Sequence, residues 1–155
     1  MNVALGYPID QVATKLSFVE TAYLLIHGNV PTQNELENFE DNIRRHTLLH
    51  EDLKDFFSGF PRRAHPMPVL SAGVSALSTY YEDSLNPKDP QQVETSIYRL
   101  IAKLPTLVAM AYKYSVGQPF VYPRNDLSYT ANFMRMMFAV PAEDYKVNDV
   151  MVRAM

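Results

Sequence analysis

One long apolar stretch, residues 96–117, constrains the fold more than any other part of the sequence. Its apolar residues recur at intervals of three and four, the period of an α-helix; they are Ile97, Leu100, Ile101, Leu104, Leu107, Val108 and Ala111. Because apolar residues lie on nearly every side of this helix, we expect it at the centre of a domain. Pro105 removes a backbone donor in mid-helix, so a kink is predicted there.

Two basic residues, Arg99 and Lys103, interrupt the apolar surface of this helix. They are four residues apart and therefore point the same way. Burying them is costly unless an anion or an acidic side chain meets them. Two more basic clusters occur in the chain, Arg44-Arg45-His46 and Arg62-Arg63-His65. Convergence of these clusters would suit phosphate binding, whereas spacing alone favours separate pairing with surface acids.

Length and composition place the chain among globular proteins. Its 155 residues are enough for one domain with a core, and 47% of them are hydrophobic against 20% charged. The net charge of −3 argues against nucleic acid as a partner. The sequence has no cysteine, which excludes disulfides and thiol chemistry. No membrane span is expected, because charged residues break the longest apolar run.

Local signals predict several further helices. Ser17 with Glu20, and Thr32 with Glu35, have the spacing of capping boxes, and Gly28 can end the first of these two helices. Further helices are expected from about His50 to Ser58, from about Pro66 to Asp83, from Asp126 or Ser128 to Pro141, and from Val147 onward. The last segment carries no stop signal and is expected to be a cut helix. With residues 1–15 interpreted as a mixed segment and no strand pattern found, the fold class is all-α with about seven helices.

Motifs for catalysis or metal binding are weak. His46 and His50 have the spacing of two helical metal ligands, but no glutamate follows the first histidine, so capping or core hydrogen bonding is favoured. Glu51 and Asp52 are adjacent and diverge on a helix, which argues against an acid–base pair. No glycine-rich phosphate loop is present. We therefore assign no catalytic residue and no metal ligand.

Four segments in a fixed order resemble citrate synthase. They are RHTLLHE at 45–51, AHPMPV at 64–69, RLIAKLPT at 99–106 and GQPFVYP at 117–123. The series is most similar to the hexameric type II enzymes of Gram-negative bacteria and runs from about Gly6 to Met155. It covers only the first part of the family's helical large domain. The resemblance thus implies that residues 1–155 are a partial large domain, without the small domain or the catalytic segments.

The resemblance implies the condensation of acetyl-CoA with oxaloacetate to citrate and CoA, in the tricarboxylic acid cycle of the cytoplasm. Acetyl-CoA would be a substrate, and no bound cofactor is implied. The family's two catalytic histidines and its aspartate lie in segments that this sequence does not contain, so this chain alone is expected to be inactive. The family also implies a homo-oligomer, a dimer or hexamer. Its dimer interface would use residues 66–83 and the central helix.

The resemblance also implies a regulatory site for NADH, away from the active site. The matching positions are Arg45, His46, Thr47, Leu48, Tyr81, Arg99, Lys103 and Asn125. Arg99 and Lys103 would hold diphosphate oxygens and Tyr81 would flank a ring. The resemblance thus favours phosphate binding, whereas spacing alone favours separate pairing with surface acids. Leu48 stands where some members have methionine. Ala142 stands where some have a reactive cysteine, so thiol-linked inactivation is excluded.

Three alternatives remain open from the sequence. The chain could be a free-standing nucleotide-binding module whose affinity fades with salt. It could be a helical interaction scaffold, although no helical repeat supports that. Within the enzyme class, 2-methylcitrate synthase is the nearer competitor, and the residues that select propionyl-CoA are expected outside this chain. The basic positions of the nucleotide site favour the citrate enzyme.

Overall fold

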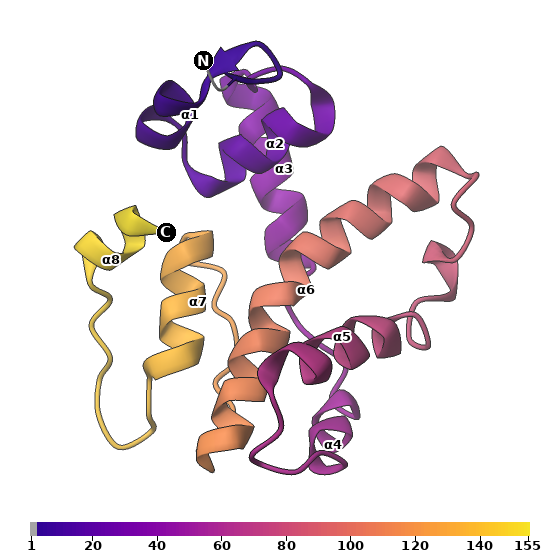
Figure 1. The fold of residues 1–155 in the computed structure, drawn as a ribbon, viewed down its shortest axis with the longest axis vertical. Coiled ribbons are helices and arrows are strands. Elements are labelled where there is room, and N and C mark those ends of the chain that lie inside the picture. The colour runs from indigo at the N-terminus through magenta and orange to yellow at the C-terminus, as the bar shows by residue number, and fades with distance from the viewer. Residues whose placement is uncertain (1–2) are drawn as a thin grey trace.

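The computed structural model describes residues 3–155, and helices dominate this part of the chain, as the all-α class predicts (Figure 1). A hairpin of two short strands comes first, with β1 at Val3–Ala4 and β2 at Tyr7–Pro8. The helices are α1 (Ile9–Lys15), α2 (Phe18–His27), α3 (Gln33–Arg45), α4 (Leu53–Ser58), α5 (Pro66–Leu77), α6 (Pro90–Val116), α7 (Tyr129–Phe138) and α8 (Asp149–Ala154), with a 3₁₀ turn, η1, at Glu82–Ser84. None of the described helices is long and apolar enough to cross a membrane.

Helix α6 is the element around which the others pack. It contacts α3, α4, α5 and α7, and it runs through the middle of the structure (Figure 1). The helix continues through the buried Pro105 and changes direction partway along its length, as Figure 1 shows. A proline interrupts the backbone hydrogen bonds of a helix, which explains a bend without a break. Both the central position and the kink that the sequence predicts are therefore present.

The core divides into two clusters, one on each half of α6. Leu107 and Met110 pack with the cluster formed by Leu49, Leu53, Phe57, Val69 and Leu77. Ala102 packs with the cluster formed by Val19, Tyr23, Phe39 and Ile43, from α2 and α3. Small residues allow close approach on the first side, where Gly73 of α5 faces Leu107. The long helix thus ties two helical groups into one body.

Both predicted capping boxes are confirmed. The hydroxyls of Ser17 and Thr32 accept the backbone N–H groups of Glu20 and Glu35, and those glutamates accept the cap N–H groups in return. Gly28 ends α2 in the left-handed region, with φ of 85°. Ser128, rather than Asp126, caps α7. A helix cap depends on residues within one turn of each other, which is why the sequence predicts caps well.

Three predictions of local structure were wrong. Residues 3–15, interpreted as a mixed segment without strands, form the hairpin and α1; Met1 and Asn2 lie outside the described residues. The short helix expected from His50 begins at Leu53. The helix expected to reach Asp83 ends at Leu77, where the hydroxyls of Ser78 and Thr79 donate to the carbonyls of Ser75 and Ala76. Such side-chain bonds compete with helix continuation, and Asp83 is thereby moved into a separate turn.

Two glycines with positive φ offer a matched test of the fold. A side chain at Gly28 would meet nothing within 4 Å, whereas a Cβ at Gly117 would lie 2.9 Å from Arg62 Nη1. We expect Gly28→Ala to lower the free energy of unfolding by about 1 kcal/mol, from backbone strain alone. Gly117→Ala should cost about 2 kcal/mol, because Arg62 must also give up its bond to the Tyr114 carbonyl. Urea unfolding of both variants measures the difference; equal losses would contradict the Arg62 contact.

Candidate functional site

The basic pair on α6 is met by an acid from η1. Arg99 forms a two-pronged ion pair with Asp83, in which Nη1 lies 2.6 Å from Oδ1 and Nη2 lies 2.8 Å from Oδ2. Nη1 also donates to the Ser84 hydroxyl. The guanidinium holds the pKa of Asp83 below its usual range by hydrogen bonding. The acid that the sequence analysis required for burial of Arg99 is therefore Asp83, sixteen residues earlier in the chain.

Lys103 is buried and ties α6 to the segment after α3. Its side chain is 3% exposed, and Nζ donates to the carbonyl oxygens of His46, at 2.8 Å, and Leu48. Burial, together with the nearby charge of Arg99, lowers the pKa of Lys103 to about 8. The next turn of α6 adds a third link, because the Thr106 hydroxyl donates to the Thr47 carbonyl at 2.9 Å. The backbone carbonyls of residues 46–48 thus all accept hydrogen bonds from side chains of α6.

Tyr81 joins the two cations. The Arg99 guanidinium carbon lies 4.5 Å from the centre of its ring, and Lys103 Nζ lies 4.9 Å from it. Both distances are in the range of cation–π attraction. This confirms that Arg99 and Lys103 point the same way, as their spacing predicts. Tyr81 therefore helps to hold two positive charges together at one place on α6.

A cavity of about 190 Å³ opens beside these residues. Arg99, Lys103, Tyr81, Ser78, Ser84 and Ser96 provide its polar lining, and Val74, Leu77, Leu85 and Leu100 provide the apolar part. Arg99 Nε is buried and has no hydrogen-bond partner among the described residues. Cations, hydroxyls and one apolar wall around a hollow form a site that can hold an anionic group joined to a flat apolar one.

The remaining predicted site residues are only partly brought together. His46, Thr47 and Leu48 reach Lys103 and Thr106 through their carbonyls, while the Leu48 side chain is 57% exposed. Arg45 lies 2.6 Å from Asp41 on its own helix and is largely exposed. Asn125 lies on the loop before α7, and within residues 3–155 no hydrogen bond joins it to the basic pair. The structure thus assembles Tyr81, Arg99 and Lys103 with the backbone of 46–48.

The 62–65 cluster does not converge with the other two, whereas His46 of the 44–46 cluster lies beside the basic pair, where its carbonyl oxygen accepts from Lys103 Nζ. Arg62 stacks on Tyr114, 5.1 Å from its ring centre, and donates to its carbonyl. Tyr114 is fifteen residues beyond Arg99 on the same helix, or about 22 Å along its axis. His65 caps α5, where its Nδ1 accepts the Met67 N–H. The predicted pairing with surface acids holds for the 44–46 cluster, where Arg44 and Arg45 lie 4.0 and 2.6 Å from Asp41. In the 62–65 cluster, Arg62 and His65 contact backbone groups instead, and no ion pair is found for it among the described residues.

The two spaced histidines have structural partners. His46 Nδ1 lies 2.7 Å from the Asn42 carbonyl, one turn earlier on α3. His50 stacks on Tyr80, with ring centres 4.9 Å apart. Both contacts fit the capping and packing roles that the sequence analysis favours over metal binding.

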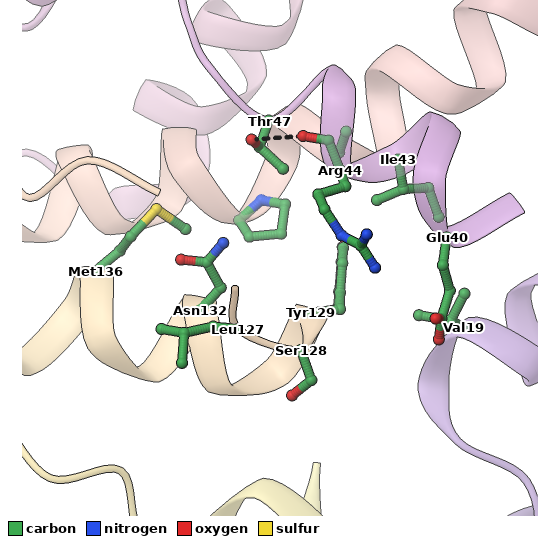
Figure 2. A pocket seen from close by; sticks show the side chains of 12 residues that line it. Val19, Glu40, Ile43, Arg44, Thr47, Leu127, Ser128, Tyr129, Asn132 and Met136 are labelled. Carbon is green, nitrogen blue, oxygen red and sulfur yellow. Dashed lines mark hydrogen bonds between the residues drawn. The ribbon is translucent and has the colours of Figure 1, made fainter. Parts of the chain in front are cut away.

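A second, smaller cavity of about 90 Å³ lies where α2, α3, α6 and α7 meet. Figure 2 shows Glu40, Ile43 and Arg44 of α3 on one side and Asn132 and Met136 of α7 on the other. Most of its uncharged polar side chains are already used: the Thr47 hydroxyl donates to the Arg44 carbonyl, the Tyr129 hydroxyl donates to the Ile101 carbonyl, and Asn132 bonds both the N–H and the carbonyl of Arg124. The charged lining residues are one base, Arg44, which lies 4.0 Å from Asp41, and one acid, Glu40. We assign no ligand to this cavity.

Comparison with known proteins decides the family. The family model for the C-terminal domain of citrate synthase matches residues 4–155. The chain belongs to the citrate synthase family. Citrate synthase 1 of Mycobacterium tuberculosis, in strains CDC 1551 and H37Rv, is 59% identical over 150 residues, which are 97% of this chain and 35% of that protein. The chain thus spans about a third of the length of these curated relatives.

Solved citrate synthases have the same fold over this region. The crystal structure of citrate synthase from Pyrobaculum aerophilum matches with a TM-score of 0.81 at 31% identity, over 96% of this chain and 38% of that one. The enzyme from Thermotoga maritima matches with a TM-score of 0.74 at 29% identity, over 96% of this chain and 36% of that one. The all-α class and the citrate synthase-like fold that the sequence predicts are confirmed.

The sequence analysis missed two partners at the site, Asp83 and Ser84. Both had been placed inside or just after a helix that ends earlier, so their approach to Arg99 was hidden. It also missed the buried Lys113, which donates to Gln118 Oε1 and to the Ala139 carbonyl, both at 2.7 Å. The available signal for Asp83 was an acid sixteen residues before Arg99, and acids at such a separation are too common in the sequence to select a partner.

The lowered pKa of Lys103 predicts how stability depends on pH. The folded chain releases this proton near pH 8, and the unfolded chain keeps it to about pH 10.5. Between these values the unfolded state binds more protons, so the free energy of unfolding should rise with pH, by about 2 kcal/mol between pH 8 and 10. Urea unfolding across this range should show the rise in the unmodified chain and in the exposed-lysine control Lys88→Met. Lys103→Met should flatten it; an unchanged slope would contradict the assignment.

Proposed function

We propose that this chain is the part of a citrate synthase that carries an effector site for NADH. The whole enzyme would condense acetyl-CoA with oxaloacetate to citrate and CoA in the cytoplasm, as a type II enzyme of the tricarboxylic acid cycle. The observation that carries the effector proposal is the pairing of Arg99 and Lys103 against Tyr81 beside a cavity. It occurs in a chain that is 59% identical to Citrate synthase 1 of M. tuberculosis.

The lining of the cavity matches the parts of a dinucleotide. Arginine binds the oxygens of a diphosphate in two-pronged fashion, and a buried lysine adds a second positive charge. Tyr81 and the apolar wall of Val74, Leu77, Leu85 and Leu100 suit a flat ring. At about 190 Å³ the hollow holds only one portion of a dinucleotide. The exposed residues Arg45, Leu48 and Asn125 would contact the rest.

The same proposal assigns no catalysis to this chain by itself. The family's catalytic histidines and aspartate belong to segments that the sequence lacks, and none of its own histidines pairs with a carboxylate in a cavity described above. A thiol-release assay tests this: the purified chain, given acetyl-CoA and oxaloacetate, should release no CoA above background. Release of CoA that depends on oxaloacetate would overturn the assignment, whatever the outcome of NADH binding.

An exposed apolar stripe on α6 supports a role in assembly. Val93, Leu100 and Leu104 are 38%, 46% and 40% exposed, and their spacing keeps them within a narrow arc of the helix. Exposed apolar patches mark interfaces, so we expect the purified chain to self-associate through α6. Light scattering should give a mass that rises with concentration in the unmodified chain and a lower mass in Leu104→Glu, which leaves the lining of the cavity unchanged. Exposed Leu25→Glu on α2 is the control; a monomer at high concentration would contradict the interface.

A further inference from the structure

We propose that Asp83 is a built-in competitor at Arg99, which an incoming phosphate group must displace. This inference rests on the proposed function, because it concerns the same anion site. We call the Asp83 carboxylate, which closes Arg99 to a phosphate until it is displaced, the gate. Asp83 occupies both terminal nitrogens of the guanidinium, at 2.6 and 2.8 Å. That two-pronged geometry is the one that a phosphate would use. In this structure, therefore, the anion-binding face of Arg99 is already filled by a carboxylate.

The two partners differ in how firmly they are held. The Arg99 side chain is 15% exposed and is packed on the Tyr81 ring, while the Asp83 side chain is 66% exposed. Arg99 also belongs to the long central helix, whereas Asp83 lies on η1, a turn of three residues. An exposed carboxylate that leaves its partner is hydrated by water, but a buried guanidinium without a partner is costly. Replacement of Asp83 by a ligand anion therefore costs less free energy than leaving Arg99 without a partner.

Further donors remain at the site after such an exchange. Arg99 Nε is buried and unpartnered in the part of the chain that the structure describes, and the Ser84 hydroxyl accepts from Arg99 Nη1 without donating to another group there. Ser84 and Lys103 both line the cavity. A phosphate at Arg99 would thus find a second cation and a hydroxyl donor that Asp83 does not use. The affinity observed for a phosphate would be reduced by the fraction of sites that Asp83 closes.

The test is a variant that removes the negative charge of Asp83 and keeps the shape of its side chain. Asp83→Asn is compared with Glu82→Gln, a neighbouring exposed acid on the same turn for which the described residues show no ion pair or hydrogen bond. Calorimetric titration of each protein with inorganic pyrophosphate, and separately with NADH, gives the dissociation constants. We expect Asp83→Asn to bind pyrophosphate about tenfold more tightly than the unmodified chain. Glu82→Gln should change affinity by less than about twofold.

Each result bears on the gate or on the nucleotide site. Equal or weaker pyrophosphate binding by Asp83→Asn would overturn the gate, because Asp83 would then help to bind or do nothing. Tighter pyrophosphate binding without NADH binding in any variant would support the gate and contradict the NADH proposal. No binding of either ligand to any variant would overturn both.

Folding of the variants is checked by circular dichroism, with Asp83→Ser as a second replacement. If both replacements unfold the chain, Asp83 is a structural partner that a ligand cannot displace, and the gate is overturned. If either replacement folds, the titrations above decide.

Discussion

Replacement of Arg99 by alanine should weaken NADH binding by about a hundredfold. Arg99 is the one cation that lines the cavity with two terminal nitrogens already arranged for a two-pronged acceptor. Removal of one member of a buried, charge-assisted pair costs about 2–5 kcal/mol in measured complexes, and about 2.7 kcal/mol corresponds to a hundredfold change. Titration of protein with NADH, followed by nucleotide fluorescence, measures the dissociation constant directly.

Arg62→Ala is the matched control for this prediction. Arg62 also stacks on a tyrosine and donates to a backbone carbonyl, but it lies at the other end of α6. The Arg62→Ala substitution removes the same charge from the chain as Arg99→Ala, and it should change NADH affinity by less than about threefold. A similar loss in both variants would show that NADH responds to net charge alone, and would contradict a defined site at Arg99.

Phe39→Ala should lower the free energy of unfolding by about 4 kcal/mol. The Phe39 side chain is 2% exposed and belongs to the cluster that joins α2 and α3 to α6. Its ring packs edge-on against Tyr23, at 5.3 Å, and lies 5.4 Å from Tyr98 of α6. Truncation of a buried phenylalanine to alanine removes buried area and leaves a cavity, for a typical loss of about 3–5 kcal/mol. Urea unfolding, monitored by circular dichroism, measures the change.

Phe138→Ala makes the same chemical change at the surface. Phe138 is 43% exposed at the end of α7 and contacts Tyr112, with ring centres 6.1 Å apart. Its loss should be about 1 kcal/mol or less, because much of its area is already in water. Equal losses at Phe39 and Phe138 would mean that α2 and α3 do not form a cooperative unit with α6.

The sequence predicted the features that depend on neighbouring residues. Both capping boxes are determined within four residues, and the left-handed Gly28 follows directly from its position after an apolar helix. The central helix is predicted because its apolar period persists over many turns and remains clear despite Arg99 and Lys103. The kink at Pro105 follows from one missing donor. Each of these is decided by local chemistry.

The failures have two causes, which are competition between local signals, and contacts between residues far apart in the chain. The helix after Pro66 has a favourable pattern up to Asp83, but hydroxyl–carbonyl bonds at Ser78 and Thr79 end it earlier. The ion pair of Arg99 with Asp83 then forms across the turn that results. No periodicity indicates such a pair, because its spacing is set by the shape of a loop.

The candidate site was likewise predicted in part. Spacing alone placed Arg99 and Lys103 together and required a partner for them, and the structure supplies Asp83 and the carbonyls of His46 and Leu48. The resemblance to citrate synthase added Tyr81, which lies against both cations. Binding of NADH at these residues stays a prediction, and so does the contribution of Asn125.

Equilibrium titration of the unmodified chain with NADH is the direct test of an effector site at Arg99, Lys103 and Tyr81. We expect saturable binding of one NADH per chain, weaker at high salt because screening reduces the attraction of Arg99 and Lys103 for the diphosphate. Pyrophosphate should compete for the same site. Absence of saturable binding at low salt, or binding that salt and pyrophosphate leave unchanged, would contradict an NADH site at Arg99 and Lys103.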